Sequence, residues 1–406
     1  MRSLLEAWNA FFFAEESPTP IALFRIIYGV LVIATLLLLR PDWLAWYGTH
    51  AWVTLPTEQM LEPGTRLNFF SIIPQSDAWI EAFFWVFLGS AALLTIGFLT
   101  RLNSVLVFLC LTSIQQRNLF ITHGGDTFLR IAGFFLIFAP AGAAISVDHL
   151  LRIWRGKEGA RIRPRMPWAQ RMIQFELSLM YFVTFCWKVE GITWVQGSAL
   201  YFVYNLDELQ RFPVPSWFLH PLMLKLGSWF ALALEFSLGI LIWIKELRYY
   251  LLALGVMFHL FLEYSLNVPM FEWDVLSAYI LFVDAADIER AWNWVRVRAT
   301  ARAGGPLEVI YDGGSERNRR NVELLTALDI LHRLTFTELK AARTRYDIPR
   351  EEGRQRILIA TRSGLRHGMD GVLALARVVP VLWPLAIPGI VRRPRGPKIS
   401  DEREAK

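Results

Sequence analysis

Long apolar stretches separated by short polar loops dominate the first 290 residues of the chain. Eight stretches are candidates for membrane-spanning helices, at roughly residues 20–39, 78–99, 102–117, 127–146, 168–187, 222–244, 248–266 and 270–285. The third and the eighth are shorter than the ~20 residues that a perpendicular span needs. The pattern predicts a polytopic membrane bundle of α-helices, with about eight spans over residues 1–290.

The pattern changes after this bundle. Residues 291–305 are basic, contain Gly304 and Gly305, and are interpreted as a linker. From there the alternation predicts strands and helices in the order β-α-β-β-α, at 307–311, 319–333, 335–338, 356–361 and 370–378, with a hairpin turn at Ser363-Gly364. This order predicts a small thioredoxin-like α/β domain over residues 306–391, followed by a disordered tail at 392–406.

The composition agrees with a protein whose main partner is the lipid bilayer. Hydrophobic residues make up 54% of the chain and charged residues only 19%, which is more apolar than a soluble domain of this size. The net charge of +6 follows from basic loops and indicates no nucleic-acid partner. Cys110 and Cys186 both fall in apolar segments, and no metal-ligand spacing is present, so no metal site is predicted.

Basic residues indicate the orientation of the bundle. The loop after the fourth apolar stretch carries seven of them: Arg152, Arg155, Lys157, Arg161, Arg163, Arg165 and Arg171. Loops rich in Lys and Arg remain in the cytoplasm. Counting spans from this loop predicts a multi-pass protein of the inner membrane with both termini cytoplasmic. It also brings His123, Lys188 and the outer half of the seventh span to the extracytoplasmic side.

Lys188 is the first candidate for chemistry, because it ends an apolar helix among Phe185, Trp187 and Trp194. Desolvation disfavours the ammonium form of a lysine, and a neutral amine can act as a base. The alternative is a structural lysine whose ammonium group extends to the lipid headgroups. Position alone favours the structural interpretation.

Other polar residues also fall within the apolar stretches. His259 and Glu263 are four residues apart, which places them on one helix face and predicts a carboxylate beside the imidazole. His123 precedes Gly124-Gly125 and fits an ordinary loop histidine as well as a site residue. Four charged residues should pair inside the bundle or line a cavity, because a charge facing lipid is costly: Arg25, Glu176, Glu235 and Asp274.

Four segments together resemble one known family. They are Tyr181–Gly197 around Lys188, Arg117–Asp126 around His123, Phe258-His259-Leu260 with Met270-Phe271 beyond it, and Pro20–Gly29. Over roughly residues 10–290 the chain resembles the vitamin K-dependent gamma-carboxylase family, whose bacterial relatives share the HTTM membrane domain. The resemblance implies an integral membrane enzyme in which Lys188 is the base toward a hydroquinone and His123 and His259 lie around the active site.

The same resemblance implies the reactants. The cofactor would be a reduced quinone similar to vitamin K hydroquinone, with O2 and CO2 as co-substrates and an unidentified second substrate. Trp194, Trp187 and Glu263 would then lie around the quinone. The family's carboxylase has a large extracytoplasmic part that holds its protein substrate, and nothing comparable follows the last predicted span here. This difference argues against glutamate carboxylation.

The turn Tyr311-Asp312-Gly313 resembles the DCC family of thioredoxin-like domains, over roughly residues 306–390. Members usually carry Cys-x-x-Cys after this turn, whereas this chain has Ser315 and Asn318. Thiol exchange needs sulfur at both positions, so we expect a redox-dead adaptor or scaffold. Two alternatives to the enzyme remain: a non-enzymatic membrane transporter or lipid-binding protein, and a thiol-disulfide oxidoreductase, which the missing cysteines disfavour.

Overall fold

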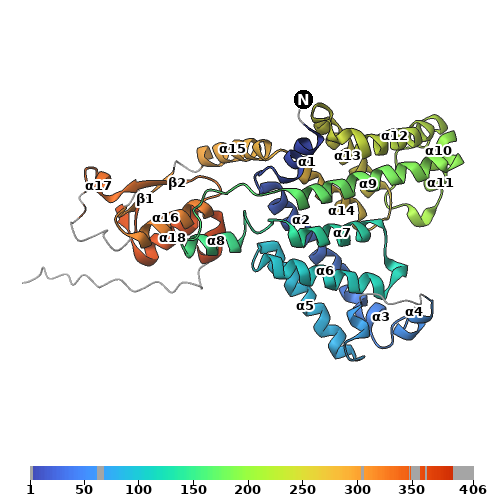
Figure 1. Cartoon of the computed structure of the whole chain (residues 1–406), viewed down its shortest axis with the longest axis horizontal. Coiled ribbons are helices and arrows are strands. Elements are labelled where there is room, and N and C mark those ends of the chain that lie inside the picture. Colours follow the sequence, from blue (N-terminus) through green and yellow to red (C-terminus); the bar gives the residue numbers. More distant parts are fainter. Residues whose placement is uncertain are drawn as a thin grey trace, which may run out of the picture. The chain divides into compact units, whose positions relative to one another are not determined.

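The structure is a computed structural model that describes residues 3–61, 68–302, 306–346, 348, 357–361 and 364–386. The chain forms two units, one from residues 1–149 and 162–288, the other from residues 150–161 and 289–406. Figure 1 shows the elements coloured along the sequence. The first unit is helical, and the second combines helices with a four-stranded sheet.

Helices form at all eight places where the sequence predicts them. The helices before residue 150 are α1 (Leu4–Phe13), α2 (Thr19–Leu39), α3 (Trp43–Tyr47), α4 (Leu55–Leu61), α5 (Asp77–Ile96), α6 (Thr100–Arg117), α7 (Gly124–Phe138) and the start of α8 (Val147–Trp154). Those that follow are α9 (Trp168–Glu190), α10 (Ile192–Gln196), α11 (Ala199–Val203), α12 (Pro221–Ile240), α13 (Lys245–Ser265), α14 (Phe271–Ser277) and the start of α15 (Ala285–Arg302). Short 3-10 turns extend several of them, including η5 (Leu241–Trp243) after α12 and η6 (Ala278–Phe282) after α14.

The count of eight spans is not supported. Among the described residues, three helical segments are long and apolar enough to cross a membrane: Thr19–Tyr47, Asp77–Ile96 and Pro221–Trp243. The other predicted spans are shorter or more polar. α7 has 15 residues and α14 has seven, while α9 carries Arg171, Glu176 and Lys188. The apolar pattern therefore predicted the positions of the helices correctly. It did not predict how many of them are long and apolar enough to cross a membrane.

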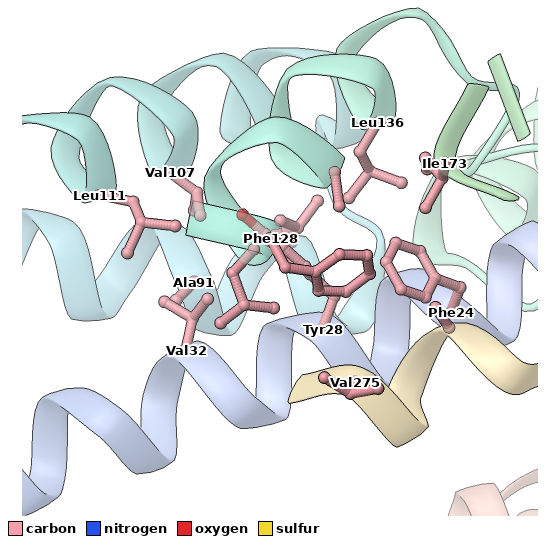
Figure 2. Packing of buried hydrophobic residues seen from close by; sticks show 14 of the residues in the cluster. Phe24, Tyr28, Val32, Ala91, Val107, Leu111, Phe128, Leu136, Ile173 and Val275 are labelled. Atoms are coloured by element: carbon pink, nitrogen blue, oxygen red, sulfur yellow. The ribbon is translucent and has the colours of Figure 1, made fainter. Parts of the chain in front are cut away.

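The core of the first unit lies between α2, α5, α7, α9 and α14. Figure 2 shows Phe24 and Tyr28 of α2 beside Phe128 of α7, with Ile173 of α9 and Val275 of α14 next to them. The backbones of α2 and α5 approach closely at Gly29, where a Cβ atom would lie 3.1 Å from Cα of Thr95. Small residues allow such close packing between membrane helices.

Arg25 of α2 is fully buried in this unit. Its guanidinium donates to the carbonyl oxygens of Ala141 at 2.7 Å and Ile145 at 2.6 Å. A third, longer bond of 3.4 Å reaches the carbonyl of Thr95, near the end of α5. The predicted partner inside the bundle is therefore a set of backbone carbonyl groups. Helix ends and turns leave such carbonyl groups without backbone partners.

The second unit contains β1 (Leu307–Tyr311), α16 (Glu316–Leu328), β2 (Leu334–Glu338), α17 (Leu339–Ala342), β3 (Leu358–Thr361), β4 (Gly364–Arg366), α18 (Gly368–Val378) and η7 (Pro380–Ala386). The strand order is β2-β1-β3-β4, with β1 parallel to β2 and antiparallel to β3. Val309, Ile359 and Leu375 form its core. The described residues thus show a small mixed α/β unit, with the short helix α17 and the strand β4 added to the expected order.

Two segments join this unit from outside the sheet. Residues 289–302 belong to helix α15, so most of the segment interpreted as a linker is helical, and Trp292 and Arg296 donate to the carbonyl of Ile330 at 2.8 and 2.9 Å. Residues 150–161 also belong to it, and the backbone N–H of Ala160 donates to Glu323 of α16 at 2.6 Å. Ser363, residues 303–305 and the predicted tail at 392–406 lie outside the described residues.

Candidate functional site

Lys188 lies in the last turn of α9 and forms an ion pair with Glu235 of α12. α9 ends because Gly191 leaves the helical conformation, and the next helix, α10, returns Trp194 over the amine, with Nζ 4.5 Å from the ring centre. The Lys188 side chain is 23% exposed, whereas the Glu235 side chain is 6% exposed. The amine is therefore held between a buried carboxylate and an aromatic face while part of it stays accessible.

This geometry corrects two expectations about Lys188. The amine is not packed among aromatic rings alone, as the sequence suggested, because it also contacts the carboxylate of Glu235. Trp187 was expected to enclose the amine, but its side chain is 75% exposed, because it lies on the outward face of α9. Of the two tryptophans predicted for the site, Trp194 is the one that contacts Lys188.

His259 lies on α13, and its carboxylate partner is not the predicted one. Its Nδ1 pairs with Glu272 of α14, which comes from a different helix. Glu263, four residues along α13, pairs instead with Arg211 in the loop before α12. The predicted pairing of His259 with Glu263 is therefore wrong: a carboxylate does lie beside the imidazole, but it comes from another helix, which the i, i+4 spacing could not indicate.

The other ring nitrogen of His259 contacts a tyrosine of α9. Its Nε2 is 2.5 Å from the hydroxyl of Tyr181 on α9, and that hydroxyl is 2.7 Å from the hydroxyl of Tyr279 in η6. Glu235 lies within electrostatic range of both His259 and Tyr181. Lys188, Trp194 and His259 are thus brought into one polar region through Glu235.

His123 occupies a separate position at the start of α7. Its Nδ1 accepts from the backbone N–H of Gly125 at 3.1 Å, and its own backbone N–H donates to Asp126 at 2.9 Å. The ring also packs edge-on against Phe271, with centres 5.9 Å apart. These contacts cap the helix, and among the described residues none of them joins His123 to Lys188 or His259.

The remaining buried acids differ from Glu235. The carboxylate oxygens of Glu176 and the Oδ1 atom of Asp274 have no hydrogen-bond partner within the described part of the chain. The hydroxyl of Tyr28 is likewise buried without a partner and lies within electrostatic range of both acids. Pairing inside the bundle therefore holds for Arg25 and Glu235 but is not seen for these two acids.

Sequence reasoning missed four members of the polar region: Glu235 as the partner of Lys188, Glu272, Tyr181 and Tyr279. Glu235 had been singled out only as a costly buried charge, and the other three gave no local signal. Each of their contacts joins helices that are between 13 and 98 residues apart in the chain. An apolar helix containing a tyrosine looks the same whether or not the hydroxyl meets a histidine.

The long apolar helices and the buried polar region define a helical membrane protein. The chain belongs to the HTTM domain family, whose family model matches residues 13–286. This family is found in vitamin K-dependent carboxylase and related membrane proteins. No match was found among the curated proteins or the solved structures.

Proposed function

We propose that this chain is an integral membrane enzyme that uses Lys188 as a base toward a reduced quinone at the extracytoplasmic side of the bilayer. The observation that supports this most is the position of the amine, which is 23% exposed beside the buried carboxylate of Glu235 and under the Trp194 ring. A flat aromatic face next to a basic group suits a quinone headgroup, which is planar, apolar and bears acidic hydroxyls. When bound, a reduced quinone supplies that hydroxyl proton and, after oxygenation by O2, the driving force for chemistry on a second substrate.

The residues of the chain supply the rest of the chemistry. Glu235 fixes the amine in place, and it can take the proton of the ammonium, which leaves a neutral amine beside a neutral carboxyl group. The pair therefore stores one proton and can offer it at either end. Trp194 covers the amine and limits its contact with water.

The topology that accompanies this proposal has both termini in the cytoplasm of a bacterial-type inner membrane. Helices too polar to qualify alone, such as α9 and α13, would be shielded from lipid by their neighbours. The second unit, a DCC-like thioredoxin-type domain, would then be cytoplasmic. Ser315 caps α16 there and Asn318 is buried, and neither side chain carries the sulfur that disulfide exchange requires.

A second candidate function is favoured by the ion pair itself. A lysine paired with a buried glutamate also fits a non-enzymatic transporter or lipid-binding protein, in which the pair holds α9 against α12. The two functions differ in whether the amine must lose its proton.

The variant Lys188→Arg separates them, because arginine keeps the ion pair but stays charged in proteins. We expect folded protein in which oxygen consumption driven by vitamin K hydroquinone falls by about 10²–10⁴-fold, the usual contribution of a general base. Lys225→Arg is the matched control, since Lys225 also lies over an indole ring, that of Trp229, at 4.9 Å. Full turnover in Lys188→Arg would contradict the assignment of the base.

A further inference from the structure

Four buried ionisable side chains form one hydrogen-bonded chain in the first unit. Glu272, His259, Tyr181 and Tyr279 come from α14, α13, α9 and η6, and none is more than 5% exposed. Burying such groups is costly, and a fully bonded network offsets that cost only if every member has a partner. Apolar side chains would pack these helices without the cost of burying ionisable groups, so this network indicates a role beyond packing.

The chain has two consistent arrangements of its hydrogen atoms. An ionised Glu272 can only accept, so His259 Nδ1–H donates to it, Nε2 accepts from Tyr181, and Tyr181 accepts from Tyr279. When Nε2 carries a proton it donates to Tyr181, and Tyr181 donates to Tyr279. In both arrangements each of the three hydrogen bonds has one donor and one acceptor. A proton can therefore enter at Tyr181 and appear on the imidazole with no movement of heavy atoms, as the Tyr279 hydroxyl rotates its hydrogen away from Tyr181.

Glu235 contacts Lys188, which lies seven residues after Tyr181 on α9, so the amine and the Tyr181 side chain lie on the same face of that helix. Its Oε1 contacts the amine, while its Oε2 is buried without a partner in the part of the chain that the structure describes. Both His259 and Tyr181 are within its electrostatic range. A carboxylate with one oxygen on the base and a second oxygen unused is suited to pass a proton onward.

We propose that Glu235 connects Lys188 to the chain Glu272–His259–Tyr181–Tyr279, which takes up the proton that Lys188 removes from its substrate. This inference rests on the proposed function of Lys188. The Lys188 ammonium gives its proton to Glu235, and Glu235 gives it through one water molecule to the Tyr181 oxygen as the Tyr181 proton moves to His259 Nε2. The result is a neutral amine, an ionised Glu235 and an imidazolium paired with Glu272, with one proton transferred and none lost. Lys188 is then ready for another turnover.

The first test needs no quinone. Nitrogen-15 spectra of histidine-labelled full-length protein in lipid nanodiscs report the protonation of the His259 ring, assigned with His259→Asn. We expect Glu235→Gln to change the protonated fraction of His259 at fixed pH. The change should be lost in the Tyr181→Phe background and kept in Tyr204→Phe, which removes another buried hydroxyl, one bonded to Ser265 at 2.8 Å. An unchanged response in Tyr181→Phe, or no response to Glu235→Gln, would overturn the relay.

The second test measures turnover with vitamin K hydroquinone. Tyr181→Phe and Glu272→Gln should lower kcat by at least about tenfold with an unchanged KM, because neither residue touches the substrate. Tyr204→Phe should retain the wild-type kcat. Full kcat in Tyr181→Phe, with Lys188→Arg inactive, would refute the relay while leaving Lys188 as the base. If the wild type itself consumes no oxygen, the proposed function fails, and the nitrogen-15 experiment alone decides whether the chain couples to Glu235.

Discussion

The close approach of α2 and α5 at Gly29 gives a quantitative prediction. A Cβ atom at this position would lie 2.2 Å from Thr95 Oγ1 and 3.1 Å from Thr95 Cα. The hydroxyl already donates to the carbonyl of Ala91 at 2.8 Å, and the backbone atom cannot rotate away. Gly29→Ala must therefore separate the helices, and overpacking of this kind costs about 1–3 kcal/mol. The intrinsic gain of about 1 kcal/mol for alanine in a helix offsets part of that.

The expected net loss is up to about 2 kcal/mol of unfolding free energy, or a fall in Tm of up to roughly 8 °C for a unit of this size. Thermal unfolding in detergent can be followed by intrinsic fluorescence, because the chain has 17 tryptophans. Gly89→Ala on α5 is the matched control, since no atom lies within 4 Å of its added Cβ, and it should be neutral or slightly stabilising. A Gly29→Ala protein as stable as Gly89→Ala would refute the packing of α2 on α5.

Three further predictions concern the second unit and the topology. Thr337 and Tyr346 donate to Glu308 at 2.6 and 2.8 Å and hold the pKa of its carboxyl below the ordinary value, so the folded state binds fewer protons than the unfolded state. Its stabilising effect should be complete above the unfolded pKa of about 4.3 and be lost as the pH falls through the lower folded pKa, and Glu308→Gln should flatten acid unfolding curves over that window. Dithiol redox activity should appear in the second unit only after Ser315→Cys and Asn318→Cys together, measured by reduction of a test disulfide; activity in the wild type would show the redox-dead interpretation to be wrong. Reporter fusions in the loop at 155–165 and after residue 300 should both give cytoplasmic signals, and a periplasmic signal at either would overturn the proposed orientation.

Local sequence was enough to find the helices, because apolar stretches of this length are too long for single strands. It could not count the spans, since that depends on which faces neighbours cover. α9 illustrates this: its charges looked compatible with a span, yet Arg171 donates to the side chain of Gln174, and Lys188 reaches α12. Three of the four strands, β1, β2 and β3, were also placed within a few residues, because β1 and β3 are short runs with β-branched residues between polar turns.

The candidate site was predictable only in part. Lys188 was found because a cation inside an apolar helix is rare, and its contact with Trp194 followed from the short loop between them. The choice of Glu272 rather than Glu263 as the partner of His259 depends on how α13 and α14 cross, which no local spacing encodes. The same holds for Tyr181, whose hydroxyl joins helices 78 residues apart. His123 shows the opposite case, in which a motif drew attention to a residue whose described contacts cap a helix.

The hydrogen bond between Ala160 and Glu323 has a consequence for synthesis of the chain. The two residues are separated by 163 positions, yet both belong to the second unit. A ribosome that adds about 5–20 residues per second needs roughly 8–30 s to reach the second partner after the first. During that interval the segment 150–161 has been made while its docking surface has not. If the chain is released before α16 is made, this segment stays exposed to proteases. Cleavage at residues 150–161 would therefore report that α16 has not been synthesised.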